Sequence, residues 1–166
     1  LGYYSRVRNL QKAAQCVMEQ HGGEFPRELP AIRALPGIGD YTAGAIASIC
    51  FEAPTAAVDG NVLRVILRLT VCADSPADVR VRRRIGEELS AVYPAGHCGD
   101  FTQALMELGA TVCLPNGAPQ CGACPLHGLC EAHALGTELQ FPTKPPKKPR
   151  RIEQRTDLRA VQQQHF

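Results

Sequence analysis

The chain has 166 residues, about the length of one domain. Apolar residues make up 45% of it and charged residues 20%, which supplies a packed core and excludes a fully disordered or collagen-like chain. With 18 basic and 16 acidic residues, the net charge of +2 neither demands nor excludes a nucleic-acid partner. No run approaches the ~18 consecutive apolar residues of a membrane helix, so we expect no membrane partner.

The first part of the chain is predicted to be helical. Apolar side chains recur at three- and four-residue steps over residues 5–21, the period of an amphipathic helix. A short helix over 30–34 and a tight turn over 35–39 follow. Asp40 is the predicted N-cap of the next helix, which Pro54 interrupts, and an extended stretch leads to a fourth helix. The predicted faces are Val7, Leu10, Ala14, Val17 and His21 in the first helix, Ala43, Ile46, Ile49 and Cys50 in the third, and Val62, Val65, Ile66 and Leu69 in the fourth.

The second part continues without any strand pattern, so the body is predicted to be all-α. A helical block begins near Ser75 and ends at Pro94, and Asp100 is the predicted cap of another helix. Residues 144–151 hold five basic residues and three prolines, which predicts a stiff, charged linker. The apolar stripes of these two helices are Val81, Ile85, Leu89 and Val92, and Phe101, Leu105, Leu108 and Val112.

Four of the eight cysteines are clustered, with seven, two and five residues between successive members. Sulfurs spaced in this way usually converge on a shared metal ion or iron–sulfur cluster, and the spacing alone leaves zinc open. A disulfide framework of a secreted protein is the alternative, which the clustering disfavours. The predicted ligands are Cys113, Cys121, Cys124 and Cys130. The scattered cysteines, interpreted as free thiols that pack as small apolar groups, are Cys16, Cys50, Cys72 and Cys98.

The turn Leu-Pro-Gly-Ile-Gly over residues 35–39 joins two predicted helices. Its glycines, Gly37 and Gly39, permit backbone angles closed to other residues and remove side chains from the surface. The N–H groups of the turn and of the next helix would then face a phosphate oxygen, a contact that positions a protein on DNA without reading sequence. A plain helix–helix connection is the alternative.

Asp59 lies between an extended stretch and a helix, in the segment Val-Asp-Gly-Asn-Val. One interpretation is an ordinary N-cap. The other is a carboxylate that the helix dipole and nearby amides hold ionised, able to stabilise a cationic, sugar-like transition state. Gly60 would let a substrate approach closely, and Asn61 would orient the carboxylate or a phosphate.

Together, these features resemble the helix-hairpin-helix DNA glycosylases that carry a [4Fe-4S] cluster, and within them the MutY-type adenine glycosylases. The resemblance implies their fold, with part of the six-helix domain over residues 1–74 and a helical iron–sulfur cluster domain over 75–142. Residues 143–151 would be the linker, and 152–166 would begin a Nudix-like domain. The matching stretches are 1–10, 35–46, 58–62, 106–113 and 121–130.

The resemblance also implies residue roles. Asp59 matches the aspartate that stabilises the oxacarbenium-like transition state, and Asn61 matches the asparagine of the same motif. Tyr3 matches a tyrosine that wedges into the duplex beside the oxidised guanine; packing on the core is its alternative. The four clustered cysteines match the ligands of a [4Fe-4S] cluster. The hairpin residues that match the phosphate-binding turn are Leu35, Gly37, Ile38 and Gly39.

Tyr41 stands where bifunctional relatives resembling endonuclease III carry the lysine that forms a Schiff base with the sugar. Tyrosine cannot form this imine, so the monofunctional adenine branch is favoured over a glycosylase/lyase. In some relatives a tyrosine here belongs to the active site, and a solvent-facing tyrosine is the alternative.

The expected function is therefore base-excision repair, by hydrolysis of the N-glycosidic bond of adenine opposite 8-oxoguanine or guanine in double-stranded DNA. We expect a monomer that acts in the bacterial nucleoid or, in a eukaryote, in the nucleus or mitochondrion. A DNA-binding module without chemistry is the alternative from a different class.

Three departures from the family pattern bear on activity. The glutamate that protonates adenine in relatives lies upstream of the segment matching Leu1, so we expect a fragment that is inactive alone. The first cysteine gap is seven residues where the family has six, a difference that a loop accommodates cheaply. That loop, residues 114–120, has no Lys or Arg to meet DNA phosphates. Residues 152–166 resemble only the entry of the Nudix-like domain.

Overall fold

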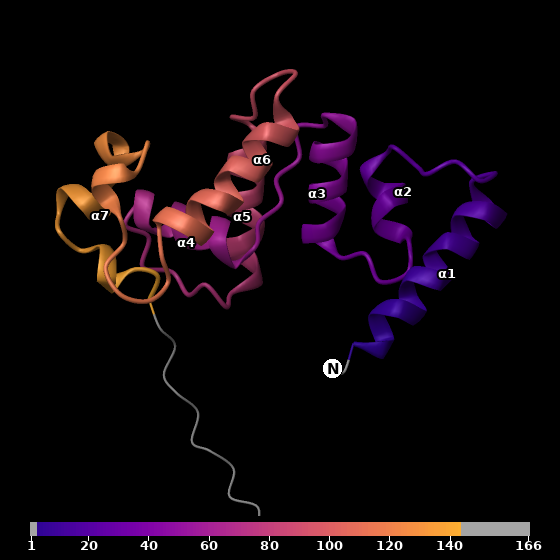
Figure 1. Ribbon diagram of the computed structural model, residues 1–166, viewed down its shortest axis with the longest axis horizontal. Helices are drawn as coiled ribbons and strands as arrows, with labels where there is room; N and C mark the ends of the chain where they lie inside the picture. The colour runs from indigo at the N-terminus through magenta and orange to yellow at the C-terminus, as the bar shows by residue number, and fades with distance from the viewer. Residues whose placement is uncertain (1–2, 144–166) are drawn as a thin grey trace, which may run out of the picture.

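A computed structural model describes residues 3–143, and every regular element within them is helical, as the sequence predicts (Figure 1). The predicted linker and terminal segment, from residue 144 on, lie outside the described residues. No helix within 3–143 combines the length and the apolar content needed to cross a bilayer. The α-helices are α1 (Tyr4–Gln20), α2 (Leu29–Ala34), α3 (Asp40–Phe51), α4 (Gly60–Leu69), α5 (Val79–Ser90), α6 (Cys98–Glu107) and α7 (Glu131–Ala134). A π-helical turn, Leu108–Val112, continues α6, and three short 3₁₀ turns follow it: Cys121–Ala123, His127–Leu129 and Glu138–Gln140.

Helix α4 forms the centre of the molecule. Every residue from Val62 to Arg68 is buried, and α4 packs against α5, α6, α7 and the π-helical turn. The single apolar face that the sequence predicts for this helix is therefore too narrow, because neighbours surround it on all sides. The core around it consists of Val58, Val62, Leu63, Ile66, Leu67, Val81, Ile85, Leu89 and Leu105.

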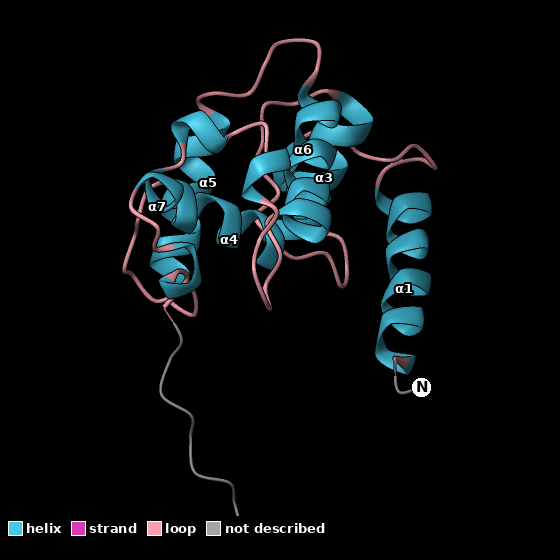
Figure 2. Ribbon diagram, turned by 60° about the vertical axis from the view of Figure 1, so that its left-hand side comes forward, coloured by secondary structure: helices cyan, strands magenta, loops and turns pink. Residues whose placement is uncertain are grey.

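Helices α2 and α3 form the predicted hairpin, and α3 lies alongside α6 (Figure 2). A chain of hydroxyl groups, of which those of Ser48 and Thr102 are buried, joins α3 to α6 and to the loop before α6. The Tyr93 hydroxyl lies 2.8 Å from Thr102 Oγ1, Thr102 donates to Ser48 Oγ at 2.8 Å, and Ser48 donates to the Gly44 carbonyl at 2.8 Å. Each hydroxyl is thereby satisfied, so the polar seam carries no desolvation penalty of an unpaired group.

Helix α1 is confirmed to within one residue at each end, and it lies on the side of the molecule away from α7 (Figures 1 and 2). Its predicted apolar stripe is exposed over the first part of the helix, where Val7 is 68% and Leu10 is 73% exposed, whereas Val17 and His21 at its end are half-buried. Ala13 is instead its buried residue, and Asn9 packs against Gly37 of the hairpin. Periodicity thus identifies the helix correctly without identifying which side packs.

Two predicted caps are wrong. The N-cap of α3 is Gly39, and Asp40 is the first helical residue, where its carboxylate pairs with Arg33 at 2.6 Å. The N-cap of α6 is His97, and Asp100 lies within the first turn. An acidic residue interacts favourably with the helix dipole anywhere in the first turn. Its presence therefore predicts that a helix begins nearby, but it does not identify the first residue of the helix.

Three predicted packing positions are also wrong. Ile49 is 40% exposed and Cys50 is exposed, because the residues that α3 buries are Ala43, Gly44, Ala47 and Ser48. Val92 is 63% exposed because α5 starts at Val79, later than predicted, and ends at Ser90. These errors arise at helix faces and ends, where a shift of one or two residues changes which side chain is inside.

Candidate functional site

Asp59 is the N-cap of α4, in extended backbone with φ −87° and ψ −173°. One carboxylate oxygen, Oδ1, accepts from the Val62 N–H at 2.7 Å, and the other, Oδ2, accepts from the Asn61 side-chain amide at 3.0 Å. The capping interpretation is therefore confirmed, as is an orienting contact from Asn61. The capping and the catalytic interpretations require the same arrangement, a carboxylate at the N-terminal end of the helix, where the helix dipole is positive.

Arg64 connects Asn61 to the cysteine region. Its Nη2 donates to Asn61 Oδ1 at 3.0 Å and to the Gly109 carbonyl at 2.7 Å, and its Nε donates to the Cys113 carbonyl at 2.8 Å. The residue is only 8% exposed, and burial lowers the pKa of its guanidinium while the charge of Cys113 opposes that shift. The two carbonyl contacts fix the guanidinium, and its third contact holds Asn61, which in turn orients Asp59.

Gly109 allows α4 and the π-helical turn to approach closely. A Cβ atom there would lie 2.5 Å from the Asn61 Cβ and 2.9 Å from its Cα, closer than real side chains come. Only glycine fits this position, so the turn after α6 fixes the location of Asn61 by backbone contact.

The hairpin turn has the predicted shape, but of its two glycines only Gly37 has a backbone conformation that requires glycine. Gly37 has φ +81°, and a Cβ atom there would lie 2.6 Å from Asn9, so both conformation and space require glycine. Gly39 has φ −95° and open space around it, so its backbone conformation is accessible to other residues. Leu35 is 2% exposed and its carbonyl accepts from the Ile38 N–H at 3.1 Å, so both close the turn internally. Within residues 3–143 no side chain caps α3, which leaves the N–H groups of its first turn available.

The two predicted tyrosines are both at the surface. Tyr41 is 43% exposed, and its hydroxyl lies 3.9 Å from Met106 Sδ. It lines a groove of about 800 Å³ together with Val58, the neighbour of Asp59. Tyr3 is 73% exposed, with the Arg6 guanidinium 5.8 Å from its ring, so packing on the core is not its role.

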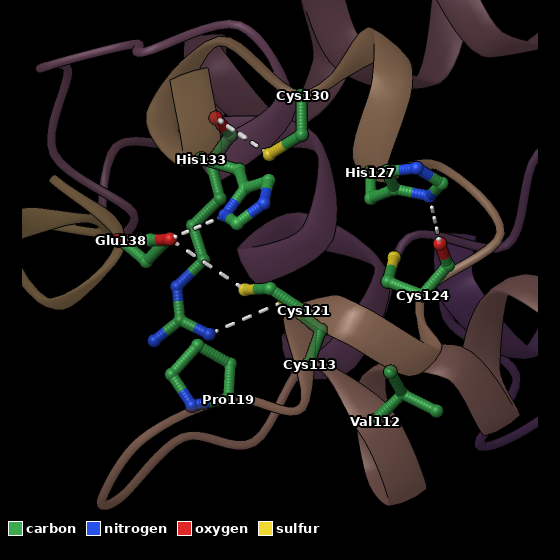
Figure 3. A pocket seen from close by; sticks show the side chains of 10 residues that line it. Val112, Cys113, Pro119, Cys121, Cys124, His127, Cys130, His133 and Glu138 are labelled. Carbon is green, nitrogen blue, oxygen red and sulfur yellow. Dashed lines mark hydrogen bonds and ion pairs between the residues drawn. The ribbon is translucent and has the colours of Figure 1, made fainter. Parts of the chain in front are cut away.

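The four clustered cysteines line one cavity, drawn in Figure 3. All eight cysteines are free thiols, which excludes the disulfide framework within this structure. The predicted convergence of Cys113, Cys121, Cys124 and Cys130 is confirmed. Four thiols around a common space form a donor set that suits an iron–sulfur cluster or zinc, and the residues therefore fit such a group.

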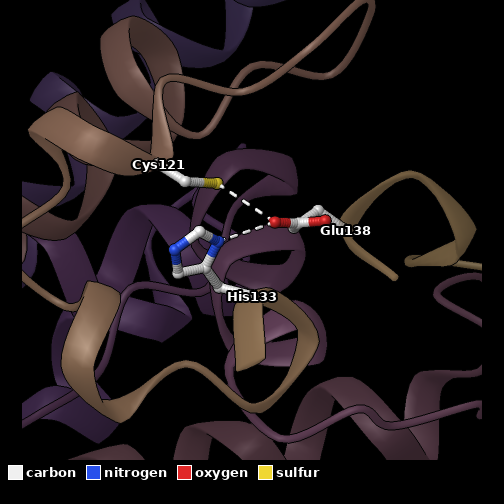
Figure 4. A group of neighbouring side chains, drawn as sticks. All are labelled: Cys121, His133 and Glu138. Carbon is white, nitrogen blue, oxygen red and sulfur yellow. Dashed lines mark hydrogen bonds and ion pairs between the residues drawn. The ribbon is translucent and has the colours of Figure 1, made fainter. Parts of the chain in front are cut away.

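Among the other residues that line this thiol cavity, His133 and Glu138 lie beside Cys121 (Figure 4). His133 Nδ1 lies 2.8 Å from Glu138 Oε1, and Cys121 Sγ lies 3.6 Å from the same oxygen. Burial, and then the charge of Glu138, raises the pKa of the Cys121 thiol. Metal binding would have to displace the thiol proton that Glu138 now accepts.

Sequence reasoning missed Arg64, Arg68, His133 and Glu138 as parts of the site. One signal was present: Arg64 and Arg68 are four residues apart on a helix that is otherwise apolar from Val62 to Leu69. Two cations on one stripe of an otherwise apolar helix indicate partners inside the protein.

Comparisons with known proteins agree with this geometry. No family model matches the sequence. The adenine DNA glycosylase of Rattus norvegicus is 47% identical over 134 residues, which is 80% of this chain and 26% of the rat protein. The structure resembles a thermostable thymine-DNA glycosylase with a TM-score of 0.68 and 32% identity, over 78% of this chain and 59% of that one.

A non-covalent complex of endonuclease III with DNA matches with a TM-score of 0.66 and 30% identity, over 81% of this chain and 60% of that one. The chain spans about a quarter of the length of the mammalian relatives that it matches. The hairpin, the capped aspartate and the four-thiol cavity thus occur here in a chain with the sequence and the fold of these proteins. This chain belongs to the adenine DNA glycosylase family of the helix-hairpin-helix DNA glycosylases.

Proposed function

We propose that this chain supplies the sugar-stabilising and DNA-holding part of an adenine DNA glycosylase. The reaction is hydrolysis of the N-glycosidic bond of adenine opposite 8-oxoguanine or guanine in double-stranded DNA. The single observation that supports it best is the Asp59 carboxylate, held at the start of α4 by the Val62 N–H and by Asn61. The names of the relatives, with 47% identity over 80% of this chain, support the choice of adenine.

The chemistry needs a base that has left the duplex, because the bond to be cut is inaccessible in stacked DNA. The first turn of α3 offers N–H donors to a backbone phosphate beside the extruded nucleotide. The bond between the sugar C1′ and the adenine nitrogen breaks, and adenine leaves with a proton. The Asp59 carboxylate stabilises the positive charge that develops on the sugar. Water then adds its oxygen to C1′, keeps one hydrogen in the new hydroxyl group and releases the other as a proton, which balances the proton that adenine took up.

Tyr41 supports a monofunctional enzyme. A lyase needs an amine that forms an imine with the opened sugar, and a phenol cannot supply it. Tyr41 is half-exposed in the groove beside Val58 and so stands where a reacting residue would have access to DNA. A bifunctional glycosylase is the second candidate, because endonuclease III is among the structural neighbours.

We infer that the four clustered cysteines hold a [4Fe-4S] cluster. When bound, such a cluster supplies folding stability to a segment rich in proline and glycine. Zinc fits the same four thiols. Analysis of iron and acid-labile sulfide in anaerobically purified protein distinguishes them: iron and sulfide in equal amounts are expected, and zinc without sulfide would contradict the cluster.

Two further expectations remain part of this proposal. We divide the chain into a hairpin-containing part, residues 1–74, and a cluster part, residues 75–142. Relatives occur in mammals and in the bacterium Buchnera aphidicola, so we place the protein with the DNA of its cell, in the nucleoid, the nucleus or the mitochondrion.

The test of the proposal is Asp59→Asn in the full-length gene product. Asparagine caps helices as well as aspartate does, so stability and binding to mismatched duplex should be preserved. Single-turnover excision of adenine opposite 8-oxoguanine should fall by roughly 10²–10³-fold, because the charge on the carboxylate is lost. Binding is measured by fluorescence anisotropy with the same duplex.

Asp78→Asn is the matched control, since Asp78 caps α5 through the Arg80 N–H at 2.8 Å. This variant removes the same charge from the same kind of helix position on α5, to which no catalytic role is assigned, so its excision rate should equal that of the wild type. Wild-type excision in Asp59→Asn would refute the role of this carboxylate.

A further inference from the structure

Arg68 is a buried cation without an acidic partner among residues 3–143. It is 4% exposed, and no carboxylate in the described part of the chain lies within 4.0 Å of its nitrogens. Burying an unpaired charge is costly, so such a group normally has an anion nearby. We therefore expect the counter-charge of Arg68 to come from a group other than a carboxylate of residues 3–143.

The hydrogen bonds of Arg68 point to the thiol cavity, which it lines. Its Nη1 donates to Cys113 Sγ at 3.2 Å and to the Leu114 carbonyl at 2.9 Å. Its Nε donates to the Phe141 carbonyl at 2.8 Å. The side chain thus bridges the first of the four clustered cysteines and the segment that follows the last of them.

Once it held a metal group, the thiol cavity would carry a net negative charge, which complements the positive charge of Arg68 beside it. Four thiolates carry more negative charge than the divalent core that they would hold, whether iron–sulfur or zinc, so the site remains anionic after loading. Arg64, one helical turn earlier, contacts the carbonyl of the same cysteine. The buried positive charge at this end of α4 therefore has its counter-charge in the cavity itself.

We propose that Arg68 is a positioning residue for the cluster: it supplies the counter-charge, and it holds Cys113 and Phe141 together around the site. This inference rests on the proposed cluster. Its hydrogen bond to the sulfur stabilises the more negative, reduced form, so Arg68 makes the reduction potential more positive. It also slows the loss of iron, because a ligand held in place recombines with the metal.

The test uses the full-length protein, purified anaerobically, with Arg68→Met and Arg68→Lys. Methionine fills similar space without charge, and lysine keeps the charge without the planar fork. Two quantities are measured: the rate of iron loss to a chelator, followed by cluster absorbance, and the midpoint potential of the cluster. Arg68→Met should lose iron about 10- to 100-fold faster than wild type and have a more negative potential. For both the rate of iron loss and the midpoint potential, Arg68→Lys should lie between the wild type and Arg68→Met.

Arg84→Met is the matched control. Arg84 also donates to a cysteine sulfur, that of Cys72 at 3.4 Å, but it lies outside the thiol cavity and pairs with Asp74. Its iron loss and potential should equal those of the wild type.

The inference is overturned if Arg68→Met retains the wild-type potential and rate of iron loss, or if Arg68→Lys has the same potential as Arg68→Met. If Arg68→Met yields no soluble protein, Arg68→Lys decides alone, and wild-type behaviour in both measurements overturns the inference. The metal content of the wild type separates the two proposals: zinc without sulfide refutes the cluster, and chelator-driven zinc loss from the same variants then tests Arg68.

Discussion

Replacing Gly109 with alanine should displace the start of α4 and thereby impair excision. The new Cβ atom would lie 2.5 Å from the Asn61 Cβ, about 1 Å short of ordinary contact, and 2.9 Å from the Asn61 Cα and carbonyl carbon. Because these atoms belong to a buried helix and not to a flexible side-chain end, the backbone of α4 or of the π-helical turn has to move.

The size of the effect follows from this contact. Overpacking of a filled interior costs about 1–3 kcal/mol. One kcal/mol corresponds to a shift in Tm of about 2–4 °C for a domain of 150–250 residues, so a fall of roughly 2–12 °C is expected in the unfolding transition of this domain. A displacement near 1 Å of the start of α4 moves Asp59 together with Asn61 relative to the rest of the site, and misplacement on this scale costs about 10²-fold in rate.

The assay is thermal unfolding of the metal-loaded full-length protein together with single-turnover adenine excision. Gly86→Ala serves as the control, because the nearest atom to its Cβ would be Val58 Cγ2 at 3.7 Å, an ordinary contact. Gly86 lies inside α5, so alanine there should stabilise the protein by about 0.5–1 kcal/mol. A Gly109→Ala protein with the Tm and the excision rate of the wild type would show that the close approach of the two helices has no consequence.

Two other substitutions test separate features. Tyr41→Lys places an amine on the exposed first turn of α3, so borohydride should trap a covalent adduct between this variant and DNA that carries the abasic product. The wild type should give no adduct. An adduct with the wild type would support the bifunctional candidate instead. Glu52→Ala removes a carboxylate that accepts from the Cys98 N–H at 2.6 Å at the start of α6, so Tm should fall by a few degrees, for about 0.5–2 kcal/mol, with excision unchanged. An unaltered Tm would show that this cap is not needed.

Local signals made much of the site predictable from the sequence. Three signals depend on only a few neighbouring residues: the glycine Gly37 in a turn, the position of Asp59 before an apolar helix, and the spacing of the cysteines. The structure contains the corresponding turn, helix cap and thiol cavity. Their chemical roles, and that of Tyr41, stay predictions. The absence of strand patterns likewise predicted a helical body, which the described residues confirm.

Features that depend on distant partners were not predictable. Arg64 contacts Gly109 and Cys113, and Arg68 contacts Phe141, from 45 to 73 residues away in the chain. Arginine is usually exposed, so composition favours a surface position for both. The packing side of α1 was predicted incorrectly for the same reason: periodicity shows which side of a helix is apolar, but it does not show which segment packs against the helix.

The hydroxyl chain between α3 and α6 has a mechanical consequence. Hydrogen bonds weaken steeply when their angle departs from linear, so these directional bonds resist a change of register between the two helices. In the proposed complex, a DNA strand held at the start of α3 would pull on that helix. The bond between Ser48 and Thr102 would resist movement of α3 relative to α6, whose continuation contacts Asn61 through Gly109, and the phosphate contact and the Asp59 carboxylate would then keep a fixed separation.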